Sequence, residues 1–118
     1  MNLILKLPEI QTFIVLIREH YAEAFESAND VDQDMNARIL SKSQCLSLAR
    51  LYNKAIQANE KGGDKQGRFI IKMDDFEIIS LMSIHLRGMN NDYVVGLINR
   101  IRQELFTYYF QLIIPRKL

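Results

Sequence analysis

Apolar side chains recur every three or four residues along most of this chain, which is the spacing of one face of an α-helix. The first stripe follows Pro8, whose fixed φ and missing N–H suit the first turn of a helix. It extends to about Ala28 and is formed by Ile10, Phe13, Ile14, Ile17, Tyr21, Ala24 and Phe25. The pattern predicts a first helix whose stripe faces the protein core.

A second helix is predicted to begin near Ser41. Ser41 and Gln44 have the spacing of a capping box, in which two side chains satisfy free backbone N–H groups of the first turn. The acidic stretch of residues 29–36 has no apolar periodicity and is therefore predicted to be a loop. The helix should end before Gly62, with a buried face made of Cys45, Leu48, Ala49, Tyr52, Ala55 and Ile56.

Two more helices are predicted in the second half of the chain. Asp74, with Glu77 three residues later, predicts the start of a third helix, and Gly88 predicts its end. A fourth helix is predicted from Asp92 to about Ile113, because the proline at position 115 cannot continue it. Four helices in 118 residues leave room for only short connections.

Short apolar segments precede the first and third predicted helices. Residues 4–10 and 70–76 share the order apolar pair, lysine, apolar, cap residue, acid, apolar. Residues 2–7 and 68–73 could therefore pair as a two-stranded ribbon, or the shared order could reflect only the chemistry of helix starts. The predicted fold class is mainly α, a compact antiparallel four-helix bundle that occupies residues 1–118 as a single domain.

The charge balance and the single cysteine restrict the function. Fifteen basic and fourteen acidic residues give a net charge of +1, whereas binding to a phosphate backbone normally requires a strong basic excess. Cys45 cannot form an internal disulfide, which favours a reducing, cytoplasmic location. The longest apolar run, residues 13–17, is far shorter than the roughly 20 residues that span a bilayer. We expect neither membrane insertion nor nucleic-acid binding.

No pattern of catalytic or metal-binding residues is complete. The acidic residues of segment 30–36 resemble the first half of a calcium-binding EF-hand loop, but Met35 and Ser41 occupy the positions of the required glycine and glutamate. His20 and His85 are too far apart in sequence to form a local metal-ligand pair; His20 is predicted to be solvated and His85 to lie in the core. Cys45 is predicted to be buried rather than nucleophilic. We expect no enzymatic activity, no metal and no cofactor.

The fourth predicted helix carries more apolar surface than one core contact requires. Its main stripe is Val94, Leu97, Ile98, Ile101, Leu105, Tyr108 and Leu112. A second apolar group, rotated well away from that stripe, is Val95, Phe106, Phe110 and Ile113. This second group predicts a protein-interaction module that forms a homo-oligomer, most simply a twofold dimer. Alternatively, the leucines at positions 3, 5 and 7 could cover this face within one chain.

A different hypothesis places function in residues 75–105. Their two helices would form a helix-turn-helix-like hairpin in a regulator associated with nucleic acid. The candidate contacts are Arg100, Arg102, Arg116 and Lys117. Asp92 counts against this hypothesis, because an acid in the first turn of the second helix would repel the phosphate backbone.

Overall fold

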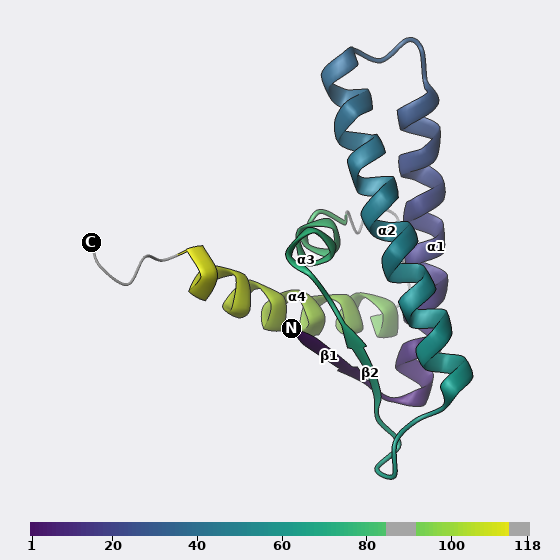
Figure 1. Ribbon diagram of the computed structural model, residues 1–118, viewed down its shortest axis with the longest axis vertical. Helices are drawn as coiled ribbons and strands as arrows, with labels where there is room; N and C mark the ends of the chain where they lie inside the picture. The colour runs from purple at the N-terminus through teal and green to yellow at the C-terminus, as the bar shows by residue number, and fades with distance from the viewer. Residues whose placement is uncertain (85–91, 114–118) are drawn as a thin grey trace.

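The computed structural model describes residues 1–84 and 92–113, with side chains up to Thr107 (Figure 1). The elements in chain order are β1 (Asn2–Leu5), α1 (Leu7–Asn29), α2 (Met35–Lys61), β2 (Phe69–Lys72), α3 (Asp75–Met82) and α4 (Asp92–Ile113). The prediction of a mainly helical chain is confirmed, and these described residues contain the four expected helices.

The two predicted strand segments form one antiparallel ribbon. Leu3 lies opposite Ile71. The N-terminal ammonium group of Met1 donates to the carbonyl oxygen of Met73 at 3.1 Å, and the backbone N–H of Met73 donates to the carbonyl oxygen of Met1 at 2.8 Å. Alternation along each strand sends one set of side chains into the core and leaves Ile4 exposed on the other face. The ribbon predicted for residues 2–7 and 68–73 is confirmed, with shorter strands.

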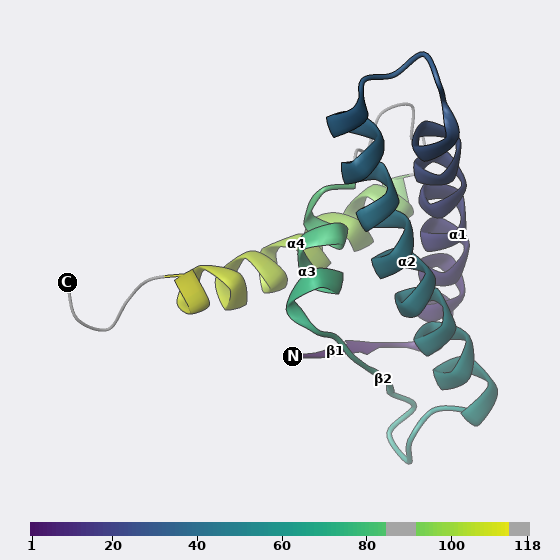
Figure 2. The same ribbon diagram turned by 45° about the horizontal axis from the view of Figure 1, so that its top comes forward.

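Helices α1 and α2 form a long antiparallel hairpin, and one end of it extends beyond the other elements (Figures 1 and 2). The predicted start of α2 was wrong, because the helix begins at Met35 rather than near Ser41. Asp34 is the N-cap residue, and its Oδ1 accepts a hydrogen bond from the backbone N–H of Ala37 at 2.9 Å. Ser41 lies inside the helix, where its hydroxyl donates to Ser27 Oγ at 2.8 Å.

Helix α3 starts as predicted but ends early. The Asp74 carboxylate accepts from the N–H of Glu77, and Glu77 Oε1 accepts from the N–H of Asp74, which completes a capping box. The helix ends at Met82 instead of continuing toward Gly88; Ser83 Oγ donates to the carbonyl of Ile79 at 2.8 Å. The predicted turn at Gly88 lies outside the described residues.

The core lies where the elements of the base meet. These are both strands, the N-terminal half of α1, the C-terminal half of α2, α3 and the first half of α4. Its largest fully buried side chains are Phe13, Leu3, Leu5, Ile10, Ile17, Leu48, Leu51, Ile71, Ile78, Leu81, Ile84 and Ile98. The stripe predicted for α1 is buried except near its end, where Tyr21 is half-buried and Phe25 is exposed. On α3, Ser80 is buried and Ile79 is exposed.

The antiparallel packing of all four helices is not confirmed. Helix α3 is only eight residues long, and α4 runs across the α1–α2 hairpin instead of along it (Figures 1 and 2). The packing therefore combines a two-helix hairpin with a smaller layer of ribbon, α3 and α4 at its base.

Candidate functional site

The two apolar faces of α4 differ in burial. The main stripe is buried in the core at Leu97, Ile98, Ile101 and Leu105, as predicted. In the second group, Val95 is half-buried and Phe106 is 54% exposed. The side chains of Phe110 and Ile113 lie outside the described part of the chain.

The second half of α4 extends away from the other elements of the molecule (Figures 1 and 2). The N-terminal leucines do not cover it as the alternative required. Leu3 and Leu5 are buried in the core through the ribbon, while Leu7 is more than half exposed. The second face of α4 is therefore a candidate interaction surface.

Two of the residues proposed to contact nucleic acid, Arg100 and Arg102, bind groups of this chain. Arg100 Nη2 lies 2.7 Å from Glu9 Oε2, and Arg100 Nη1 lies 3.2 Å from Glu104 Oε1. Arg102 Nη2 donates to the carbonyl oxygen of Met82 at 2.8 Å. These contacts tie α4 to α1 and to the end of α3. Arg116 and Lys117 lie outside the described residues.

A second apolar surface, which the sequence analysis missed, lies on the α1–α2 hairpin. It is a groove of about 550 Å³, and all the described residues that line it belong to these two helices. We call it the hairpin groove and define it by Tyr21, Phe25, Met35, Ile39 and Leu46, with Arg38 and Lys42 beside them. Of the five defining side chains, all except that of Tyr21 are more than half exposed.

The spacing of Met35, Ile39 and Leu46 gives the sequence signal for this groove. They lie four and seven residues apart, which places them on one face of a helix. The signal was lost because residues 29–36 were predicted to be a loop, so Met35 was not counted as helical. Once α2 begins at Met35, the three side chains form a stripe.

Cys45 lines the inner side of the hairpin groove and is buried, as predicted. Burial raises the pKa of its thiol, and the positive charge of Lys42 opposes that effect only partly. A thiol whose pKa is raised is mostly protonated at neutral pH and is a poor nucleophile. The observed environment suits a packing role for Cys45.

His20 was predicted to be solvated, and this prediction was wrong. The residue is buried on α1, and its Nδ1 lies 3.5 Å from Glu23 Oε2 in the next turn. His85 lies outside the described residues. Within residues 1–84 and 92–113, no three histidine, cysteine or carboxylate side chains converge in a way that could hold a metal ion.

The acidic segment 30–36 has structural roles in the hairpin. Asp30 Oδ1 accepts from the N–H of Asp32 at 3.0 Å, which closes a tight turn, and Asp34 caps α2. The absence of calcium binding stays a prediction for this segment.

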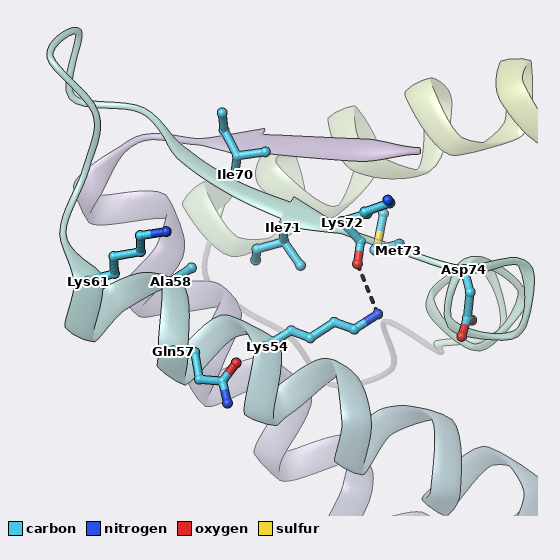
Figure 3. Close-up of a pocket in the computed structure, with 9 residues that line it drawn as sticks. All are labelled: Lys54, Gln57, Ala58, Lys61, Ile70, Ile71, Lys72, Met73 and Asp74. Carbon is cyan, nitrogen blue, oxygen red and sulfur yellow. Dashed lines mark hydrogen bonds between the residues drawn. The ribbon is translucent and has the colours of Figure 1, made fainter.

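Figure 3 shows a further pocket, of about 520 Å³, between α2 and β2. Lys54 reaches across it from α2, and its Nζ donates to the carbonyl of Lys72 at 3.0 Å and to Glu77 Oε1 at 2.6 Å. The side chain of Glu77 is fully buried, and the same Oε1 accepts from the N–H of Asp74. Lys54 thus links α2, β2 and the start of α3, and its ammonium group is engaged in structural bonds.

A comparison with protein-family models, curated proteins and solved structures finds no match for this chain. Among the helices of the described residues, none is long and apolar enough to cross a membrane. Within the described part of the chain, the candidate sites are the second face of α4, the hairpin groove and the ion pair of Lys54 with the buried Glu77.

Proposed function

We propose that this protein is a small, non-catalytic protein-interaction module that self-associates through the second face of α4. The observation that carries the proposal is the position of Phe106, which is 54% exposed on the half of α4 that extends beyond the other elements (Figure 1). The sequence adds two tyrosines, Phe110, Leu112 and Ile113 in the following turns of this helix. A helix segment of that composition is stable when a partner surface buries it.

The exposed aromatic side chain of Phe106 would gain free energy from burial against a partner. Burying one large apolar side chain contributes roughly 1.5–3 kcal/mol, and a small domain has only about 5–15 kcal/mol of stability. Dimerisation through α4 would therefore add a sizeable stabilisation to each chain. A twofold axis is the simplest symmetry that pairs the same surface on both copies.

The proposal also places the protein in the cytoplasm. Its support is the single buried Cys45, which suits a reducing compartment and has no second cysteine with which to form a bond inside the chain.

Size-exclusion chromatography with light scattering at micromolar concentration tests the self-association. We expect the mass of a dimer for the wild type and the mass of a folded monomer for Phe106→Glu, because a carboxylate cannot be buried in an apolar contact without a partner. Thr107→Glu, at the neighbouring exposed position of α4, is the matched control and should remain a dimer. Circular dichroism checks that each variant is folded.

A monomeric wild type would overturn the proposal. An unfolded Phe106→Glu variant, next to a folded Thr107→Glu, would instead place Phe106 in the core of a single chain.

A further inference from the structure

We infer that the hairpin groove binds an amphipathic helix of another protein, one whose apolar stripe is flanked by acidic residues. This inference goes beyond the proposed self-association, because it concerns a different surface and a different partner. The mode of binding is a single helix that lies in the groove between two others.

The hairpin groove continues along α1 and α2 toward the base of the molecule. A smaller pocket of about 260 Å³ shares Tyr21 and Ala49 with it and adds Arg18, Tyr52 and Asn53. All the described residues that line either cavity belong to α1 and α2. The α2 side of this surface runs from residue 35 to residue 53, which is roughly 27 Å of helix at about 1.5 Å per residue. The surface therefore has room for a partner helix of about five turns.

The centre of the hairpin groove is apolar. Phe25, Met35, Ile39 and Leu46 are each more than half exposed, so each has apolar surface that a partner can remove from water. Two helices alone bury only the narrow stripe between them, whereas a third helix laid along the groove buries a second stripe. The shape and the apolar centre both suit an amphipathic helix.

The charges beside this apolar centre are all positive. Arg18, Arg38 and Lys42 line the groove and its continuation, and no carboxylate is among the described lining residues. None of the three forms an ion pair with a carboxylate of residues 1–84 or 92–113. Between Asp34 and Glu60 the sequence of α2 contains no acidic residue at all. A helix with acidic residues on both sides of its apolar stripe therefore complements the groove.

The same charges favour a helix over two other anionic or apolar partners. An anionic membrane would meet the whole tip of the hairpin, including the exposed Asp30, Asp32 and Asp34, and the net charge of the chain is only +1. A single helix contacts only the groove. The second half of α4 from another copy is also a poor match, because residues 105–113 contain no acidic residue.

A displayed library of helical peptides tests the chemistry of the partner. Each peptide of about 18 residues carries leucine along one face, and the positions that flank this face vary among glutamate, glutamine and lysine. We expect selection on the wild-type protein to enrich glutamate at the flanking positions. Isothermal titration calorimetry then gives the affinity of the selected glutamate peptide, which should fall as the salt concentration rises.

Adjacent residues of α2 show where the peptide binds. Ile39 lines the hairpin groove, whereas Leu40 lies on the other side of the helix, beside Ser27 and Ser41. We expect Ile39→Glu to weaken binding of the glutamate peptide at least tenfold and Leu40→Glu to leave it within about twofold. Both side chains are more than half exposed, so both variants should fold, as circular dichroism would verify.

Reversal of one charge tests the electrostatic match. Lys42→Glu should weaken binding of the glutamate peptide about tenfold and should strengthen binding of the same peptide with lysine at the flanking positions. Lys65→Glu, at an exposed position between α2 and β2, changes the net charge by the same amount and is the matched control. It should leave both affinities within about twofold.

The alternatives give different outcomes. Enrichment of lysine or glutamine, or no enrichment, overturns the inference, and so does a glutamate peptide whose binding neither Ile39→Glu nor Lys42→Glu weakens. Binding to phosphatidylglycerol vesicles that Ile39→Glu abolishes, with no selection of glutamate peptides, would make the groove a lipid-binding surface instead. Phe106→Glu should bind the glutamate peptide as the wild type does. A failure of this inference therefore leaves the proposed self-association through α4 intact.

Discussion

The two ends of the α1–α2 hairpin differ in what holds them together. At the base, the helices pack against the ribbon, α3 and α4, and Ile17, Leu48 and Leu51 have less than 2% of their surface exposed. At the tip, residues 25–44, no side chain is buried. The same two helices therefore pass from a region stabilised by tertiary packing to one stabilised by local interactions.

The interactions at the tip are hydrogen bonds between nearby residues. Ser27 Oγ donates to Gln33 Oε1 at 2.7 Å and accepts from the hydroxyl of Ser41, and Arg38 Nε donates to the carbonyl of Ala28 at 3.1 Å. Together with the Asp34 cap, these bonds fix the turn without burying apolar surface. The exposed apolar side chains at the tip therefore contribute little to the fold of one chain, which leaves them available for a partner.

The largest expected effect is a difference between base and tip in how much a core-type truncation lowers the free energy of unfolding. Leu51→Ala should lower the free energy of unfolding by about 2–5 kcal/mol, because it leaves a cavity in the packed base. Leu40→Ala, on the same helix but at the tip, should change it by less than about 0.5 kcal/mol. Urea unfolding followed by circular dichroism measures both values. Similar losses for the two variants would mean that the tip is packed as tightly as the base.

The second prediction concerns the ion pair that links α2 to β2 and α3. Lys54→Met should cost about 2–3 kcal/mol, because it leaves the buried carboxylate of Glu77 with only the N–H donated by Asp74. Lys42→Met, an exposed lysine beside the hairpin groove, serves as the control and should be nearly neutral.

Adding Glu77→Gln to Lys54→Met tests the physical cause. The amide keeps an oxygen acceptor for the Asp74 N–H but carries no charge, so the double variant should recover part of the lost stability. If the double variant is instead the less stable of the two, the cost of Lys54→Met does not come from an uncompensated buried charge.

The parts of the fold that sequence predicted well depend on neighbouring residues. The Asp74–Glu77 capping box and the buried stripe of α4 follow from spacings within one element, and the ribbon was predicted from the residue order that segments 4–10 and 70–76 share. The start of α2 was missed because Ser41 and Gln44 have capping-box spacing inside a helix, while the true cap, Asp34, resembled one more acid of a loop. Local patterns alone cannot decide which of two possible N-caps begins a helix, because that choice depends on tertiary contacts.

The candidate sites, too, divide into one that the local sequence pattern predicted and others that depend on tertiary packing. The exposed aromatic Phe106 was predicted, because the periodicity of α4 gave more apolar positions than one core face needs. The hairpin groove was not, since it requires the relative position of two helices. The burial of Glu77 and its pairing with Lys54, 23 residues away, depend on tertiary packing that no spacing encodes.

The smallest expected effect compares the N-cap residues of α3, at the base, and α2, at the tip. Burial alone would raise the pKa of Asp74, but the hydrogen bond from the N–H of Glu77 and the charge of Arg50 outweigh it, so the pKa is lowered. A lowered pKa means that ionised Asp74 stabilises the fold above its ordinary pKa of 3.8, and that this contribution is lost as the pH falls through the folded-state value.

Asp74→Asn keeps a capping acceptor and removes only the charge. Because the side chain is partly exposed, we expect a loss of about 0.3–1 kcal/mol at pH 7 that shrinks as the pH falls below 3.8. Asp34→Asn should cost less at pH 7, since the third residue of α2 is Ala37, which cannot complete a capping box. Thermal melts of the three proteins from pH 7 to pH 3 measure these differences, and a gap between wild type and Asp74→Asn that widens in acid would contradict the assigned sign.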